Sequence, residues 1–377
     1  MPYWRLSSFY FFYFATLGVL VPYWGLYLQS LGFTPVDIGQ LIALLMLSRI
    51  VAPIVWAWVA DHRGQRMRMV RLTSAATLLC FAGAFFGTGF WWLAAVMLAF
   101  SFFWHASLPI LEVTVLNHTA TRPGAYGRVR LWGSIGFIVS VLVLGAIIDL
   151  GGPWWVLPSL LLFMTGIWAF SLALPEPRVA APAGHLGPFL KAVLRPEVFG
   201  FLLACLLMQL SHGPYYTFYS IYLESHGYSK TLIGALWAFA VVCEIGVFLG
   251  MQRLLVRWAL RPVLLASFFL AALRWAMIGL FPQHLWLLIV AQSLHAASFG
   301  AFHATAVQMV HRFFTGRHQN RGQAVYGSAS FGIGGALGSL YSGYTWETLG
   351  AGASFGIAAA AAAAAWVVAW LLIRPRS

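Results

Sequence analysis

Charged residues are scarce in this chain, and their scarcity excludes a water-soluble domain. Only 8% of the 377 residues are charged, while 61% are hydrophobic. A soluble domain of this length would carry roughly a quarter charged residues. The formal charge of +13 does not indicate nucleic acid as a partner, because the basic residues lie in short connectors without the interleaved aromatic side chains on which bases stack.

Cysteine is also rare, and the sequence shows no other pattern of metal-ligating residues. The three cysteines, Cys80, Cys205 and Cys243, each lie inside an apolar run. The sequence therefore indicates neither a disulfide framework nor a thiolate metal site. We expect no cofactor and no metal. A membrane-embedded enzyme is the alternative class, but it would need a nucleophile and a base that come together, and the sequence shows no such set.

Long apolar runs, by contrast, recur from one end of the chain to the other. Each is long enough to cross a hydrocarbon core of about 30 Å as a helix. The strands of a membrane barrel would instead alternate over segments of about ten residues. The sequence predicts an all-α membrane protein with twelve transmembrane helices, at 5–29, 36–60, 69–88, 91–117, 128–149, 153–174, 197–223, 230–252, 262–281, 284–311, 322–346 and 350–373.

The basic residues predict how these helices are oriented. All but three of the 22 Lys and Arg residues lie at the termini, in alternate connectors or near a span end on one side. By the positive-inside rule this side is cytoplasmic, which makes the chain a multi-pass protein of the cell (inner) membrane with both termini inside. A Pro-rich cytoplasmic connector (175–196) then separates an N-terminal six-helix bundle (1–174) from a C-terminal one (197–377).

The two halves repeat one another. Residues 27–41 (YLQSLGFTPVDIGQL) match residues 222–236 (YLESHGYSKTLIGAL), and Gly133-Ser134 matches Gly327-Ser328 at nearly the same shift. Parallel repeats of this size are typical of secondary transporters whose substrate lies between the halves near the middle of the membrane. Chance similarity between apolar helices is the alternative. Such a two-half plan needs no partner chain, so we expect a monomer surrounded by lipid.

Two acidic and three basic residues fall inside the predicted helices. A charge there costs about 2.5–3.5 kcal/mol on insertion scales and persists where it is paired or lies in a wet cavity. The short connector between the fourth and fifth helices can bring Glu112 level with Arg130. The acids and bases of the set are Glu112, Glu244, Arg49, Arg130 and Arg274.

Histidines and a second acid–base pair predict a proton-coupling site in the C-terminal half. Glu244 and Arg274 lie in the eighth and ninth helices, and His295 and His303 in the tenth. Histidine titrates near neutral pH, and burial moves carboxyl groups towards it, so either could carry a proton. The alternative is a purely structural role. Both acid–base pairs would then be static interhelical ion pairs, and the two histidines would make ordinary polar contacts between helices.

Aromatic side chains gather around two prolines at repeat-related places. Tyr23 and Tyr27 follow Pro22 in the first helix, and Tyr215 and Tyr219 follow Pro214 in the seventh. Prolines break helix regularity where binding or gating occurs in many transporters. These four tyrosines are candidates for lining a substrate cavity, with lipid-facing positions as the alternative.

Two stretches resemble known transporters. Residues 57–66 (AWVADHRGQR) resemble the major facilitator signature between the second and third helices, which implies a cytoplasmic gate made by Asp61, Gly64 and Arg66. Ala57 replaces the first glycine of that signature and Gln65 an arginine, and the second-half counterpart, 250–261, lacks the acid. Residues 126–137 (YGRVRLWGSIGF) resemble the fifth-helix motif of the phenylpropionate permease group and, more distantly, lactose permease.

These resemblances imply a major facilitator fold and proton-coupled transport of a small molecule. Glu112 precedes Arg130 by the spacing of the substrate-binding acid in lactose permease, and Phe137 replaces an aromatic that stacks on sugar. Glu244, Arg274 and His295 resemble the polar set of that symporter, with Ser298 where an acid is expected.

Several functions remain open on the sequence alone. The first is proton symport of an aromatic carboxylate such as phenylpropionate, bound by Arg130 or Arg49, since guanidinium groups bind carboxylates with two hydrogen bonds. Symport of a sugar or nucleoside, or proton-driven export, would use the same residues. A sensor without transport is a different class, and the chain offers no long cytoplasmic domain to relay its signal.

Overall fold

The architecture is entirely helical in the part of the chain that the structure describes. The computed structural model describes residues 2–119, 124–174 and 189–374, and these ranges contain helices and no strands. Ten of the described helices are long and apolar enough to cross a membrane. The predicted all-α membrane fold is confirmed.

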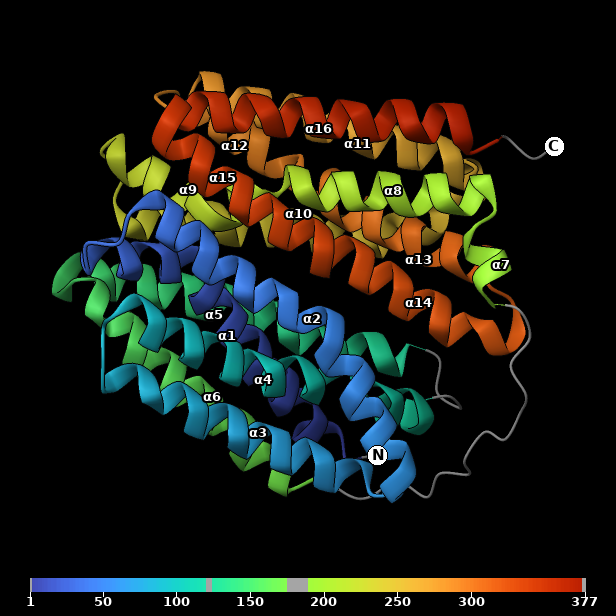
Figure 1. Cartoon of the computed structure of the whole chain (residues 1–377), viewed down its shortest axis with the longest axis horizontal. Coiled ribbons are helices and arrows are strands. Elements are labelled where there is room, and N and C mark those ends of the chain that lie inside the picture. The colour runs from blue at the N-terminus through green and yellow to red at the C-terminus, as the bar shows by residue number, and fades with distance from the viewer. Residues whose placement is uncertain (1, 120–123, 175–188, 375–377) are drawn as a thin grey trace. The chain divides into compact units, whose positions relative to one another are not determined.

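Each of the first six predicted spans has a helix in the structure (Figure 1). α3 is only 17 residues long and carries Arg66, Arg68 and Arg71 in its first turns. α1 continues through Pro22 without interruption, so the predicted break there is wrong. The helices are α1 (Tyr3–Ser30), α2 (Pro35–Arg63), α3 (Arg66–Ala82), α4 (Phe90–Thr119), α5 (Ala125–Gly151) and α6 (Val156–Leu172).

The second six spans are more interrupted. A short helix, α7, precedes them; the seventh span breaks at His212, just before Pro214, and the tenth and eleventh contain π-helical turns. A π turn inserts a residue into the helix, and such turns often lie at functional sites. The elements are α7 (Phe189–Val193), α8 (Pro196–Ser211), α9 (Gly213–Ser225), α10 (Lys230–Arg257), α11 (Leu260–Leu280), α12 (Leu285–Ser293), a π turn (Ala296–Ala301), α13 (Phe302–Phe313), α14 (Gln319–Gly327), a π turn (Ser328–Gly334), α15 (Gly335–Leu349) and α16 (Ala351–Leu372).

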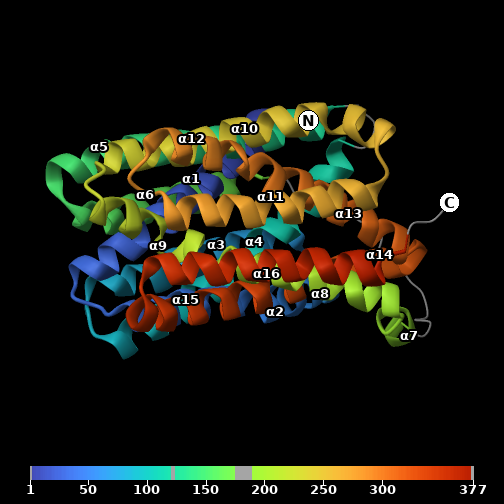
Figure 2. The same cartoon turned by 90° about the horizontal axis from the view of Figure 1, so that it is seen from above.

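The chain forms two compact units. Unit 1 comprises Met1–Phe33, Leu47–Ala183 and Ser229–Ala235, and unit 2 comprises Thr34–Met46, Gly184–Tyr228 and Leu236–Ser377. In unit 1, α1 packs against α5 and α6, and α3 packs against α4 and α6. In unit 2, α16 packs against α8 and α11, as both views show (Figures 1 and 2), and α9 packs against α15.

Small residues allow these helices to approach closely. A Cβ atom at Gly334 or Gly338 would lie 2.6 or 2.8 Å from the carbonyl oxygen of Leu206 or Leu210, which leaves room for hydrogen alone. The GxxxG spacing thus serves the backbone contact typical of membrane helices. In unit 1, a Cβ atom at Gly136 would meet the carbonyl oxygen of Phe11, so α1 and α5 approach in the same way.

Asp149, at the end of α5, caps the start of α10 inside unit 1. Its carboxylate accepts hydrogen bonds from the backbone N–H groups of Lys230 and Thr231, both at 2.8 Å, and from the Thr231 hydroxyl at 2.6 Å. An anion at this position satisfies N–H groups that have no partner within the helix and is favoured by the helix dipole.

Replacing Asp149 should therefore destabilise the protein. We expect Asp149→Ala to lower the free energy of unfolding by about 1 kcal/mol, the usual cost of losing a cap. Thr231→Ala removes only the hydroxyl bond and should cost less. Thermal unfolding of the detergent-solubilised protein measures both. Equal melting temperatures for Asp149→Ala and the unmodified chain would show that the cap contributes nothing.

Candidate functional site

Arg274 is the centre of a polar cluster in unit 2. It lies in α11 and is fully buried. One terminal nitrogen donates hydrogen bonds to His295 Nδ1 and Ser298 Oγ, both at 3.1 Å, and the other donates to Gln292 Oε1 at 2.8 Å. Three acceptors from the tenth span therefore fix the guanidinium.

His295 connects Arg274 to Glu244. Its Nε2 atom lies 3.3 Å from Glu244 Oε2. Arginine can only donate, so Nδ1 of His295 is the acceptor and Nε2 carries the proton that faces the carboxylate. A continuous series from guanidinium to imidazole to carboxyl thus runs from Arg274 in α11, through His295 just before the π turn of the tenth span, to Glu244 in α10. A Cβ atom at Gly300, in the π turn, would lie 3.1 Å from Glu244 Cγ, so glycine leaves room for the acid.

Aromatic rings enclose Arg274. Its guanidinium carbon lies 4.1 Å from the ring centroid of Tyr215 and 4.5 Å from that of Trp275. Each ring face stabilises the cation electrostatically, with more effect where water is excluded. The Tyr215 hydroxyl donates to Gln292 Oε1 at 3.2 Å, and the Tyr219 ring lies 4.9 Å from the Tyr215 ring. Tyr215 and Tyr219 therefore belong to the surroundings of Arg274.

His303, the other predicted coupling histidine, lies on the far side of Phe299. The Phe299 ring is stacked between His295, at 5.3 Å, and His303, at 6.0 Å. His303 Nδ1 lies 3.2 Å from the Tyr326 hydroxyl. The structure thus brings Glu244, Arg274 and His295 together and places His303 one ring further along the tenth span.

In unit 1, Arg49 contacts a histidine in α4. Its Nε donates to His105 Nε2 at 3.0 Å, and the Ser48 hydroxyl lies 2.7 Å from His105 Nδ1. Because Nε2 accepts from arginine, Nδ1 carries the hydrogen and donates to Ser48. His105 is therefore a neutral bridge between two residues of α2.

Glu112 and Arg130 lie near each other without forming a close ion pair. Glu112 Oε1 accepts a hydrogen bond from the Tyr126 hydroxyl at 3.4 Å and is within electrostatic reach of Arg130. The Arg130 guanidinium carbon lies 3.9 Å from the ring centroid of Phe14. Within residues 2–119, 124–174 and 189–374, no salt bridge joins Glu112 to Arg130, so the static ion pair is not the arrangement found.

Tyr13 lies among the embedded charges of unit 1. Its hydroxyl is within electrostatic reach of Arg49, Glu112 and Arg130, and its ring stacks on Trp104 at 4.9 Å. Tyr10, one turn earlier in α1, is near Glu112 and Arg130. Neither tyrosine was predicted from the sequence. Their position in the first helix, which neighbours the charged fourth and fifth helices, could have identified them. Aromatic residues occur on all sides of α1, however, so this position did not distinguish them.

Three other predicted binding residues lie elsewhere in unit 1. The Tyr23 hydroxyl donates to the carbonyl oxygen of Val141 at 2.6 Å, which fastens α1 to the backbone of α5. Tyr27 is buried against Trp24, with ring centroids 5.2 Å apart. Phe137 is buried in α5 where Gly18 of α1 approaches it. None of these contacts involves an embedded charge, and their predicted role in substrate binding is untested.

The predicted cytoplasmic gate is described only in part. Asp61 belongs to α2, but its side chain lies outside the described residues. Gly64 follows α2 with a φ of +63°, a backbone conformation that favours glycine. Arg66 is the first residue of α3. The positive φ explains why glycine occupies position 64, and the gating role of these three residues stays a prediction.

Gln292 is a functional candidate in unit 2 that the sequence did not predict. It is fully buried, and its amide oxygen accepts from both Arg274 and Tyr215. Buried amides are rarely left without such partners, because an unsatisfied polar group costs free energy. Gln292 lies one turn before His295 on the tenth span, and this spacing could have identified it as part of the same cluster.

The fold and these two polar clusters define a helical membrane transporter, since embedded charges on membrane helices mark substrate and ion pathways. A family comparison names the class: residues 3–357 match the MFS_1 like family, and the chain belongs to it. It is therefore a transporter of small molecules and not an enzyme, as predicted.

Similar proteins cover nearly the whole chain. "Probable 3-phenylpropionic acid transporter" of Escherichia coli (strain K12) is 29% identical over 91% of both chains. "Maltose permease" of Geobacillus stearothermophilus is 26% identical over 92% of this chain and 88% of its own. The crystal structure of nucleoside transporter NupG superposes with a TM-score of 0.84 over 100% of both chains at 17% identity, which supports the fold.

Gly133 makes room for Arg130, and its loss should disturb the unit 1 cluster. A Cβ atom there would lie 2.7 Å from Phe14 Cδ2 and 2.9 Å from a terminal nitrogen of Arg130. We expect Gly133→Ala to displace the guanidinium and weaken substrate affinity about tenfold, the equivalent of one lost charged hydrogen bond.

The repeat supplies a matched control. Gly327 is the repeat partner of Gly133, and a Cβ atom there would meet nothing within 4 Å. Gly327→Ala should therefore leave affinity unchanged. Substrate counterflow in proteoliposomes compares the two variants. If both transport like the unmodified protein, the space at Gly133 has no bearing on the site.

Proposed function

We propose that this chain is a proton-coupled symporter of an aromatic carboxylate, with 3-phenylpropionate as the favoured substrate. The observation that carries the proposal is that embedded charges lie among aromatic rings in unit 1. Its cluster contains two embedded arginines, Arg49 and Arg130, and one embedded acid, Glu112. His105 is a neutral bridge in this cluster. In this proposal the guanidinium of Arg130 binds the carboxylate of the substrate.

The rings around these charges suit an aromatic substrate. Tyr10, Tyr13 and Phe14 lie beside Arg130 or Glu112, and Trp104 stacks on Tyr13. Arginine binds a carboxylate with two parallel hydrogen bonds, while aromatic walls accept a phenyl ring in offset or edge contact. The similarity to a relative named for 3-phenylpropionic acid supports the same substrate.

Coupling is proposed to use the unit 2 cluster. Glu244 is the acid of the series that begins at Arg274, and His295 connects the two. We propose that Glu244 takes the coupling proton and that His295 and Arg274 set its affinity. Ser298, where the resemblance expects an acid, donates or accepts only a hydroxyl hydrogen bond. His303 would then adjust the site from beyond Phe299.

The remaining predictions complete the proposal. Six-helix halves at 1–174 and 197–377 would work by alternating access as a monomer, with the 175–196 connector and both termini in the cytoplasm. Asp61, Gly64 and Arg66 would form the cytoplasmic gate, and Tyr23, Tyr27, Phe137, Tyr215 and Tyr219 would shape the path. Residues 175–188 lie outside those described.

Sugar transport is the second candidate, and export is the third. Glu112 with stacking aromatics would equally hold sugar hydroxyls, and a relative named maltose permease supports this reading. A nucleoside would use the same groups. Proton-driven export would use the same coupling site, with the substrate moving outward as the proton moves inward.

Uptake into proteoliposomes under an imposed pH gradient separates these candidates. With a panel of 3-phenylpropionate, maltose and uridine, we expect accumulation of the aromatic acid, abolished by a protonophore. Glu112→Gln should reduce this uptake at least tenfold, because the carboxylate that accepts from Tyr126 also orients the guanidinium of Arg130. The control Glu224→Gln, at the end of α9, should not.

Other outcomes have definite meanings. Accumulation of maltose or uridine in place of the acid would contradict the substrate proposal and keep the symport mechanism. Uptake that ignores the pH gradient would contradict the coupling. Normal transport by Glu112→Gln would remove this residue from the site.

A further inference from the structure

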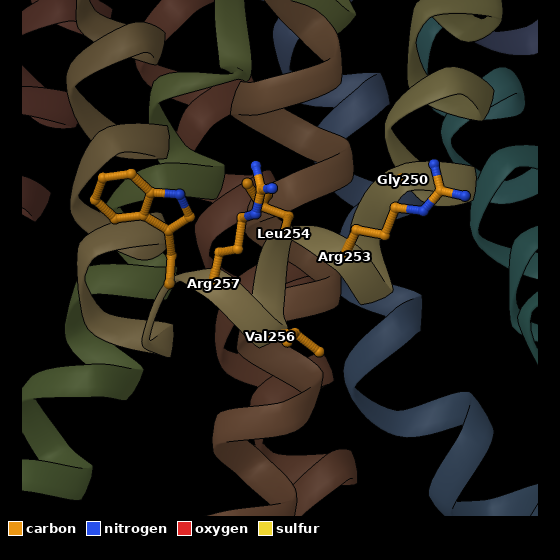
Figure 3. Close-up of a pocket in the computed structure, with 6 residues that line it drawn as sticks. Gly250, Arg253, Leu254, Val256 and Arg257 are labelled. Carbon is orange, nitrogen blue, oxygen red and sulfur yellow. The ribbon is translucent and has the colours of Figure 1, made fainter.

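The cytoplasmic end of α10 carries a basic hollow that the transport site does not use. Its lining comes from one stretch of chain in unit 2: Gly250, Arg253, Leu254, Val256, Arg257 and Trp258. Figure 3 shows the guanidinium groups of Arg253 and Arg257 extending to the same side of the helix. The apolar span of α10 ends at Met251, so this hollow lies where a membrane span gives way to polar surroundings.

A second, apolar hollow adjoins the first. It lies between α10 and α13 and is lined by Phe248, Met251, Leu255, Val256, Ala304 and Gln308. Val256 lines both hollows and is 88% exposed, and Leu249 nearby is 82% exposed. Side chains of this kind at the edge of a membrane span face lipid.

The two arginines have no protein partner to neutralise them. Throughout 2–119, 124–174 and 189–374, neither Arg253 nor Arg257 forms a hydrogen bond or ion pair, and both are exposed. Arg261, four residues further on, differs because it donates to the carbonyl oxygen of Trp370 at 2.8 Å. Two cations one helical turn apart can hold a single phosphate between them.

We propose that these adjoining hollows bind one anionic phospholipid, with its phosphate on Arg253 and Arg257 and an acyl chain along Phe248, Met251 and Ala304. The shape and the charge both match an amphiphile: a cationic hollow meets an apolar groove at Val256. Trp258 follows the end of the apolar span of α10, and tryptophan is enriched at membrane interfaces.

The internal repeat gives this site a structural reason. Residues 250–261 occupy the place in the second half that residues 57–66 occupy in the first, but they contain no acid corresponding to Asp61. The phosphate would provide the negative charge that this connector does not have. A lipid held there would brace α10, the helix that carries Glu244.

Native mass spectrometry of the whole detergent-solubilised protein tests the proposal, with phosphatidylglycerol and phosphatidylcholine of equal chain length as probes. We expect the anionic lipid to bind more tightly, and Arg253→Ala/Arg257→Ala to weaken it about 25-fold, since each basic residue contributes about fivefold at an anionic headgroup. Arg253→Lys/Arg257→Lys should retain part of the affinity. The exposed pair Arg63→Ala/Arg68→Ala should leave it unchanged.

Two further experiments test whether the ligand is a lipid. Ala304→Trp fills the apolar groove and should weaken phosphatidylglycerol at least fivefold, with the melting temperature reporting that the variant folds. Inorganic phosphate should compete only weakly with the lipid. Equal binding of both lipids, an undiminished affinity in Arg253→Ala/Arg257→Ala, or full competition by phosphate would each overturn the proposal.

Discussion

A positive charge buried among membrane helices must be stabilised by what surrounds it, and the second unit is organised around that requirement at Arg274. Three acceptors and two aromatic faces enclose its guanidinium. Removing a partner from a buried charge is costly, which constrains Gln292, Ser298 and His295 together. The π turn that follows His295 belongs to the same arrangement, because it carries Ser298 and the glycine that leaves room for Glu244.

Both units have an embedded charge next to a histidine at repeat-related positions, but the two charges have opposite signs. Arg49 and Glu244 occupy repeat-related positions, and each contacts a histidine, His105 in one unit and His295 in the other. In both cases an arginine donates to the imidazole, so its other nitrogen carries the hydrogen. A neutral histidine beside an embedded charge is thus a repeated element of the fold. In the second unit the series ends at the carboxyl group of Glu244, where we propose that the proton is taken up.

Much of the fold could be predicted from the sequence because the membrane imposes simple rules. Hydropathy located twelve helical spans, and each has a helix in the structure. Proline was a weaker guide: the chain breaks near Pro214 but not at Pro22, because neighbouring helices can satisfy the groups that a proline frees. The π turns depend on packing between helices, which no local pattern encodes.

The candidate site was predictable in its charges and less so in its neutral residues. Embedded charges are rare enough to be identified individually, and the structure brings Glu244 and Arg274 together through His295. Tyr13 and Gln292 were missed, since aromatic and amide residues are common in these helices and periodicity did not show which face they occupy. Tyr23 was chosen for its place near a proline, but its hydroxyl is fastened to the backbone of α5.

We propose that substrate binding in the unit 1 cluster is accompanied by proton uptake at Glu244. The most direct measurement is the number of protons taken up when the solubilised protein binds 3-phenylpropionate in weak buffer, read with a pH-sensitive dye. The account predicts about one proton per bound substrate in the unmodified protein, and none in Glu244→Gln with binding retained. Proton uptake that persists in Glu244→Gln would contradict it and move the coupling proton to another residue.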